Sequence, residues 1–193
     1  SKTRYVDQSG TSVKRDFVEA PSQMFEEWAR RDEPLALFAQ ICPTCPRLTK
    51  EQIAQLDAAR KFGLGNFFAR QGEYALYDMR LHTGTPGAPM PPWIAIENAG
   101  PLGFVDGSLF PAGFGHLLGG YAAGYYGYMW SQVIALDMLS AFDGKLMNPA
   151  VGQRYRQTIL ASGGQRQPHA LVEAFLGRKP NSDAFYAEIN GTR

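Results

Sequence analysis

The sequence lacks the features that mark membrane-spanning and nucleic-acid-binding proteins. Among its 193 residues, no window approaches the roughly 20 apolar residues that cross a bilayer. Its 19 basic and 18 acidic residues leave a net charge of +1, without the basic excess typical of nucleic-acid binding. Residues 1–5 also lack the apolar core of a signal peptide. We therefore expect a globular, cytoplasmic protein that binds neither nucleic acid nor a membrane.

Cysteine is scarce as well, since Cys42 and Cys45 are the only two. Their Cys-Pro-Thr-Cys spacing suits a dithiol redox pair or half of a zinc site. A redox pair normally opens a helix after a strand, whereas this one lies in a Pro-rich connection that ends at Thr49. A four-ligand zinc site would need a second pair, which the sequence lacks. The context argues against both, and a dithiol redox protein remains one hypothesis.

Strand-like alternation is nearly absent, whereas helix signals recur along the chain. Thr49 and Gln52 have the spacing of a capping box, and apolar residues follow at helical intervals. Asn148-Pro149 is typical of a helix start, and Gly144 and Gly177 are typical stops. The expected fold class is mainly α, a single helical domain over residues 1–193, with room for a short strand in the first 15 residues.

The most unusual segment is residues 113–128, where six glycines and four tyrosines surround His116. Glycine inside a helix costs about 1 kcal/mol relative to alanine, so such density indicates backbone that bends, moves or approaches a ligand. Tyr121, Tyr125 and Tyr128 are spaced i, i+4, i+7, which predicts one face of a helix running from Gly120 to about residue 142. The alternative is an aromatic core stripe, the commoner meaning of such spacing.

A second unusual segment, residues 16–23, places Asp16 and Glu19 among apolar residues at a predicted helix start. Asp16 as N-cap with Glu19 three residues later would form a capping box, so a purely structural role is open. Pro21 complicates this role, because its ring removes a bond to the carbonyl of Phe17. The helix must therefore start late or kink there.

These two segments resemble the thimet oligopeptidase family of zinc metallopeptidases. The resemblance rests on residues 16–23 and 116–130 and continues through residues 148–156, 159–160, 163–164 and 175–178. Nearly the whole chain therefore resembles the carboxyl-terminal part of the family's zincin-type catalytic domain. That family hydrolyses peptide bonds of short peptides by means of metal-activated water.

The resemblance implies roles for particular residues. It matches Glu19 to the family's glutamate ligand of zinc, and it matches His116, Tyr125 and Tyr128 to residues that stabilise the developing oxyanion. Tyr121 matches a residue of the substrate channel, and it could instead pack or support the loop. Gly119 and Gly120 would belong to a flexible loop that binds substrate.

The chain departs from the family in one respect, because it has no His-Glu-x-x-His motif. Its three histidines, His82, His116 and His169, lack the i, i+4 spacing needed to bind zinc on one helix. We expect a truncated chain that holds no zinc by itself, is inactive alone, and pairs with the missing amino-terminal part of the same enzyme or self-associates. The alternative is a natural, non-catalytic helical module that binds peptides or a partner.

Overall fold

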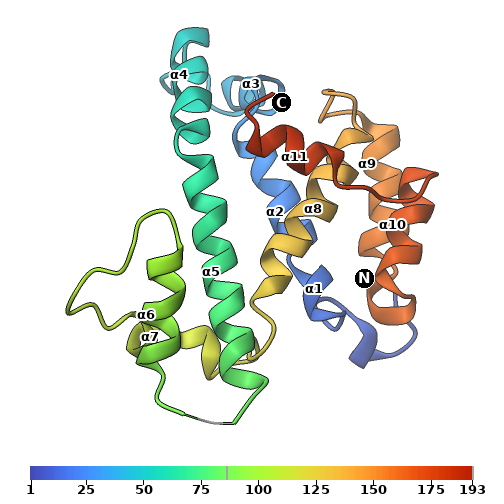
Figure 1. The fold of residues 1–193 in the computed structure, drawn as a ribbon. Helices are drawn as coiled ribbons and strands as arrows, with labels where there is room; N and C mark the ends of the chain where they lie inside the picture. The colour runs from blue at the N-terminus through green and yellow to red at the C-terminus, as the bar shows by residue number, and fades with distance from the viewer. Residues whose placement is uncertain (86, 193) are drawn as a thin grey trace.

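The computed structural model describes residues 1–85 and 87–192, and within that part of the chain every regular element is helical (Figure 1). The α-helices are α1 (Arg15–Val18), α2 (Ala20–Phe25), α3 (Asp32–Ile41), α4 (Lys50–Lys61), α5 (Leu64–His82), α6 (Met90–Ala99), α7 (Phe110–Gly113), α8 (Tyr126–Ser140), α9 (Pro149–Tyr155), α10 (Pro168–Leu176) and α11 (Asp183–Ile189). Short 3-10 helices occur at Val6–Gln8, Glu26–Ala29, Gly115–Leu117 and Gly163–Gln165, and a π-helical turn spans Arg156–Leu160. The mainly α prediction is confirmed.

The short strand allowed for in the first 15 residues is wrong. That segment contains the 3-10 helix Val6–Gln8 and turns, and its link to the rest of the chain includes one backbone bond, from the amide of Lys2 to the carbonyl of Ala161 (2.7 Å). A strand needs a neighbour with which to form a ladder, and residue 161 lies in a turn between helices. The segment therefore packs as a turn against the helical body.

Several helix ends follow the residues that predicted them. Thr49 and Gln52 form a reciprocal capping box at the start of α4, with N···O distances of 2.8 and 3.2 Å. The side-chain oxygen of Asn148 accepts from two backbone amides at the start of α9. Gly177, with φ of 72°, ends α10 in the left-handed conformation that glycine adopts without strain.

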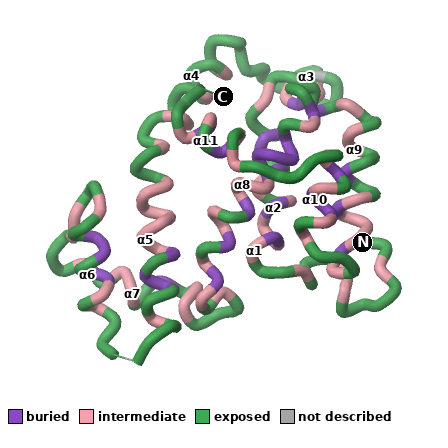
Figure 2. Tube along the Cα trace, turned by 45° about the vertical axis from the view of Figure 1, so that its right-hand side comes forward, coloured by how far each residue is buried: buried purple, intermediate pink, exposed green. Residues whose placement is uncertain are grey.

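The central helix is α8, which contacts α1, α2, α5, α10 and α11. The main core forms where α8 meets α1, α2, α9 and α10, and a smaller core joins α5, α6 and α7. Buried residues follow α8 and α2, whereas α4 is exposed along most of its length (Figure 2). None of the described helices is long and apolar enough to cross a membrane.

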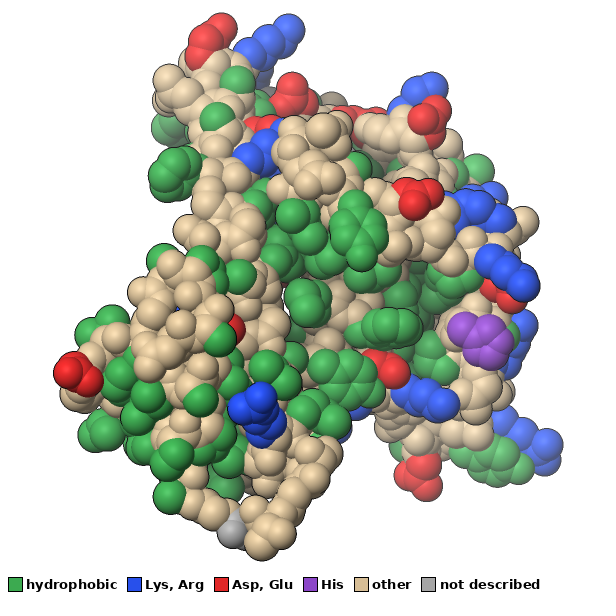
Figure 3. Space-filling view, in the orientation of Figure 1, with side chains coloured by type: hydrophobic (Ala, Val, Ile, Leu, Met, Phe, Trp, Pro, Cys, Tyr) green, Lys and Arg blue, Asp and Glu red, His purple; other side chains and the backbone are tan. Residues whose placement is uncertain are grey.

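The second half of α8 is covered on most sides, whereas its first half is partly exposed. Ala135, Leu136, Met138 and Leu139 are buried, whereas Trp130 is 57% exposed. Hydrophobic side chains gather over the middle of the face seen in Figure 3. A groove of about 610 Å³ is lined in part by Trp130, Ile134 and Tyr186.

Candidate active site

The position of Glu19 is set by the close crossing of α1 and α8. A Cβ atom at Gly127 would lie 3.0 Å from the carbonyl oxygen of Arg15, so only glycine lets the two backbones approach this closely. The hydroxyl of Ser131 donates to the carbonyl of Asp16 (2.8 Å) and ties the crossing. Glu19, directly after α1, is thereby held opposite the first turn of α8.

Glu19 lies at the break between α1 and α2, and the predicted effect of Pro21 on the helix is confirmed. The capping-box interpretation is wrong, because α1 begins at Arg15, its N-cap is Lys14, and no side chain caps it. Asp16 is instead inside the first turn, two residues after the N-cap position. The Glu19 carboxylate accepts hydrogen bonds from the hydroxyls of Ser22 (2.9 Å) and Tyr121.

The predicted helix from Gly120 is wrong in its start, since α8 begins at Tyr126 and residues 118–125 form turns. Glycines at 119, 120 and 124 weaken helix formation, and Ala123 adopts a left-handed backbone conformation with φ of 52°. Tyr121, Tyr125 and Tyr128 therefore do not share one helical face. Their rings nevertheless meet, because the turns fold back over the start of α8.

The turns are anchored by Asp78 of α5, a residue that sequence reasoning missed. Its fully buried carboxylate accepts from the backbone amides of Ala123 (3.0 Å) and Tyr125 (2.9 Å), and His82 lies 3.0 Å from the same carboxylate. Asp78 thus satisfies two amides that would otherwise be buried without acceptors. The only sequence signal is a carboxylate on the otherwise apolar side of a long helix.

Four aromatic residues, which we call the tyrosine cluster, converge here: His116, Tyr121, Tyr125 and Tyr128. The rings of Tyr121 and Tyr128 stack with centroids 5.3 Å apart and planes 7° apart. The His116 ring meets the three tyrosines edge-on, at centroid distances of 5.5, 5.0 and 5.7 Å. The Tyr128 hydroxyl lies 3.4 Å from Nε2 of His116, so its polar group faces the imidazole.

Burial raises the pKa of two of these phenols, which are already protonated at neutral pH. Desolvation raises the pKa of Tyr125 to about 12, and its hydroxyl donates to the side-chain oxygen of Gln71 (3.0 Å). Desolvation, and next the hydrogen bond to Glu19, raise the pKa of Tyr121 above its ordinary value. Both side chains are therefore O–H donors at neutral pH. Gln71 was not predicted, and nothing in its local pattern distinguishes it from an ordinary helix residue.

Gly119 and Gly120 are exposed, and Gly120 lies beside Arg15. A Cβ atom at Gly120 would lie 3.5 Å from a guanidinium nitrogen of Arg15, whose Cζ is 4.5 Å from the centre of the Tyr121 ring. The glycines thus border the tyrosine cluster on its open side. Tyr126 is 41% exposed, and no hydrogen bond or ring contact joins it to the cluster within the described residues.

The other predicted ligand types do not gather at this site. Across residues 1–85 and 87–192, no three His, Cys, Asp or Glu side chains form a group that could hold a metal ion. His169 is exposed on α10, and His82 pairs with Asp78. Cys42 and Cys45 are joined by a disulfide in the connection between α3 and α4.

Comparison with known proteins identifies the family. The model of peptidase family M3 matches residues 1–191. The chain belongs to peptidase family M3. It is 36% identical to a thimet-like oligopeptidase of Dictyostelium discoideum over 98% of the chain and 29% of that protein. It is also 37% identical to oligopeptidase A of Escherichia coli, over 91% of the chain and 27% of that protein.

A third relative is named for a different activity. Dipeptidyl carboxypeptidase of Salmonella typhimurium is 32% identical over 93% of the chain and 28% of its own length. This M3 chain therefore spans less than a third of the length of these three relatives. The family resemblance seen in its motifs is confirmed.

Proposed function

We propose that residues 1–193 form the carboxyl-terminal part of the catalytic domain of a zinc oligopeptidase that hydrolyses internal bonds of short peptides in the cytoplasm. The observation that carries this proposal is the meeting of Glu19 with the tyrosine cluster, through the bond from the Tyr121 hydroxyl to the Glu19 carboxylate. A carboxylate beside several neutral hydrogen-bond donors is an arrangement that can support hydrolysis of a peptide bond, because the donors can stabilise charge on its carbonyl oxygen.

The donor set of this chain fits zinc in part. Glu19 supplies one carboxylate oxygen ligand, whereas catalytic zinc sites use three protein ligands. The family resemblance assigns the other two to a His-Glu-x-x-His helix, which this sequence does not contain. When bound, zinc would activate the attacking water. We therefore propose that the chain alone is inactive and works with the remainder of the same enzyme.

Three side chains would stabilise charge in the reaction. Negative charge develops on the carbonyl oxygen when a peptide bond is attacked, and neutral O–H or N–H donors aimed at that oxygen lower the barrier. We assign this role to the hydroxyls of Tyr125 and Tyr128 and to the imidazole of His116. Gly119, Gly120 and Tyr121 would position the substrate, and loop movement would bring the donors to it.

A second candidate is favoured by the incomplete ligand set. A helical module could retain the tyrosine cluster and bind peptides without cutting them. The coding sequence before residue 1 separates the two, because a His-Glu-x-x-His codon run would support the peptidase, whereas an initiation codon directly before residue 1 would support the module. The cluster would be a binding surface in both cases.

The proposal is tested by Glu19→Gln in a protein that joins this chain to its preceding zinc-binding helix. The amide is nearly isosteric and a poor zinc ligand, so we expect loss of most bound zinc and activity with little change in melting temperature. Zinc analysis and thermal unfolding on one preparation measure both effects. Full zinc content with normal turnover in this variant would overturn the proposal.

A further inference from the structure

A groove of about 340 Å³ extends from the tyrosine cluster along α2, α5 and α8. Tyr128 belongs to both, because its ring stacks in the cluster while the residue lines the groove. Gln71 connects the two, since it accepts a hydrogen bond from Tyr125 and lines the groove. A peptide held at the cluster would therefore have this groove directly beside it.

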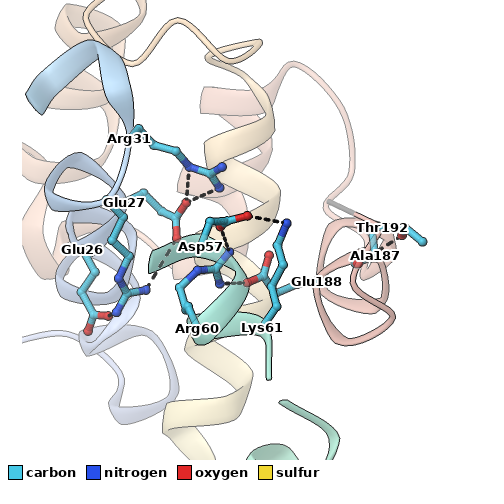
Figure 4. Close-up of polar contacts among 10 residues, drawn as sticks. Glu26, Glu27, Arg31, Asp57, Arg60, Lys61, Ala187, Glu188 and Thr192 are labelled. Atoms are coloured by element: carbon cyan, nitrogen blue, oxygen red, sulfur yellow. Dashed lines mark hydrogen bonds and ion pairs between the residues drawn. The ribbon is translucent and has the colours of Figure 1, made fainter. Parts of the chain in front are cut away.

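One end of the groove carries charged side chains that neutralise one another (Figure 4). Arg31 donates to Glu27 (2.6 and 2.9 Å), Arg60 pairs with Glu188 and Asp57, and Lys61 pairs with Asp57 (2.7 Å). With the pair of Arg30 and Glu26, the network contains four carboxylates and four cations. Of these residues, Glu26, Glu27, Glu188, Arg30 and Arg60 line the groove, and each of them lies in an ion pair that compensates its charge.

The middle of the groove is lined by carboxamides. Nε2 of Gln23 donates to the carbonyl of Tyr128 (3.1 Å), which fixes the orientation of the side chain. Its Oε1 is buried and has no donor within the described residues. A buried acceptor left without a donor is destabilising, so a ligand N–H close to it would be favourable. Gln71 and Gln132 add two carboxamides, which match both polar groups of a peptide bond.

The remaining wall is apolar and exposed. Phe62 is 90% exposed and Phe67 is 54% exposed, and Leu64 lies between them in the sequence. Large apolar side chains gathered beside polar groups are typical of a surface that contacts a ligand. These side chains would cover an apolar ligand group, whereas a charged ligand group would find no polar partner among them.

We propose that this groove is a subsite for a neutral, apolar side chain of a peptide whose backbone lies at the tyrosine cluster. The assignment rests on the proposed peptidase function, which it deepens by naming the side-chain class that the site prefers. Gln71 and Gln132 would contact the peptide backbone beside that side chain, and Phe62 and Phe67 would cover it.

The binding of small blocked amino acids to the 193-residue chain tests the subsite without requiring catalysis. We expect N-acetyl-phenylalanine amide to shift the backbone amide signals of Phe68, Gln71 and Gln132 saturably in a nitrogen-15 NMR titration. N-acetyl-glycine amide and N-acetyl-aspartate amide should bind at least about fivefold more weakly, because they lack an apolar body to bury. Equal affinity for all three compounds, or shifts confined to other regions, would overturn the assignment.

A matched pair of variants locates the binding. Phe67→Ala should weaken binding of N-acetyl-phenylalanine amide about fivefold to tenfold, because this side chain lines the groove and is exposed to a ligand there. Phe38→Ala, at another exposed phenylalanine outside the groove, should leave the affinity unchanged. Equal effects of the two substitutions would contradict the subsite. If Glu19→Gln kept full zinc content and normal turnover while N-acetyl-phenylalanine amide still bound saturably, the subsite would stand and the peptidase assignment would fall.

Discussion

Tyrosines near the start of α8 and a tyrosine beyond its end have different surroundings. At its start, the hydroxyls of Tyr121, Tyr125 and Tyr128 each lie beside a polar partner, and the rings are half-buried. Beyond its end, Tyr155 packs edge-on against Phe25 and Phe175 at centroid distances of 5.8 and 5.5 Å. Its hydroxyl has no partner within the described residues, and burial raises the pKa of the group.

This difference separates a polar aromatic site from a packed core. Tyr155 contributes apolar ring area to the main core, where its hydroxyl adds nothing to the packing. The phenols of the tyrosine cluster keep their polar atoms at an open face and bonded to side chains that are themselves polar. The sequence shows tyrosines in both regions. Only the hydrogen-bond partners of the hydroxyls distinguish the polar cluster from the packed core.

The largest expected effect is that of His116→Ala in the proposed longer peptidase, the protein that joins this chain to a zinc-binding helix. If the polar contacts of the tyrosine cluster serve catalysis, loss of the His116 donor should lower kcat about 100- to 1000-fold. This corresponds to roughly 3–4 kcal/mol of transition-state stabilisation, and the change in KM should be much smaller. Steady-state kinetics measure the split. His169→Ala is the control, because His169 is exposed on α10. A loss of stability without a loss of kcat would make the cluster a core like that around Tyr155.

A smaller effect is expected from Asp78→Asn, which tests how the tyrosine cluster is held. The amide group would place a donor against one of two backbone amides, so the unfolding free energy should fall by about 2–3 kcal/mol. Amide hydrogen exchange at Ala123 and Tyr125 should accelerate more than exchange in the main core.

Asp143→Asn is the control for this substitution. Asp143 is exposed, and asparagine tolerates its left-handed backbone (φ 50°). Unchanged exchange at Ala123 and Tyr125 in the Asp78 variant would show that the turns do not depend on this carboxylate.

The smallest of these effects concerns the crossing that brings Glu19 to α8. Gly127→Ala places a methyl group 3.0 Å from the Arg15 carbonyl and should cost about 1–2 kcal/mol of stability. Gly152→Ala, in the open part of α9, has no atom within 4 Å of the added carbon and should stabilise by about 0.5–1 kcal/mol. Urea unfolding of both variants measures the contrast, and equal changes would remove the close-crossing account.

The sequence predicted the helical class, several helix ends and the residues of the cluster, but not how the cluster forms. Local signals such as Thr49, Asn148 and Gly177 act on neighbouring backbone, so they can be read from a few residues. The start of α8 could not be predicted in this way, because the turns that precede it are stabilised by Asp78, which lies on a different helix. The same holds for Gln71 and for the Gly127 crossing, since both depend on residues more than fifty positions away.

The most direct test of the account compares Tyr128→Phe with Tyr155→Phe in the longer peptidase. Both changes remove one hydroxyl from a tyrosine ring that packs against other aromatic side chains. We predict a fall in kcat of about 100- to 1000-fold for Tyr128→Phe, because the proposed function assigns its hydroxyl to the developing oxyanion. For Tyr155→Phe we predict an unchanged kcat. Equal kcat values for the two variants would contradict the assignment of the tyrosine cluster as the catalytic donor site.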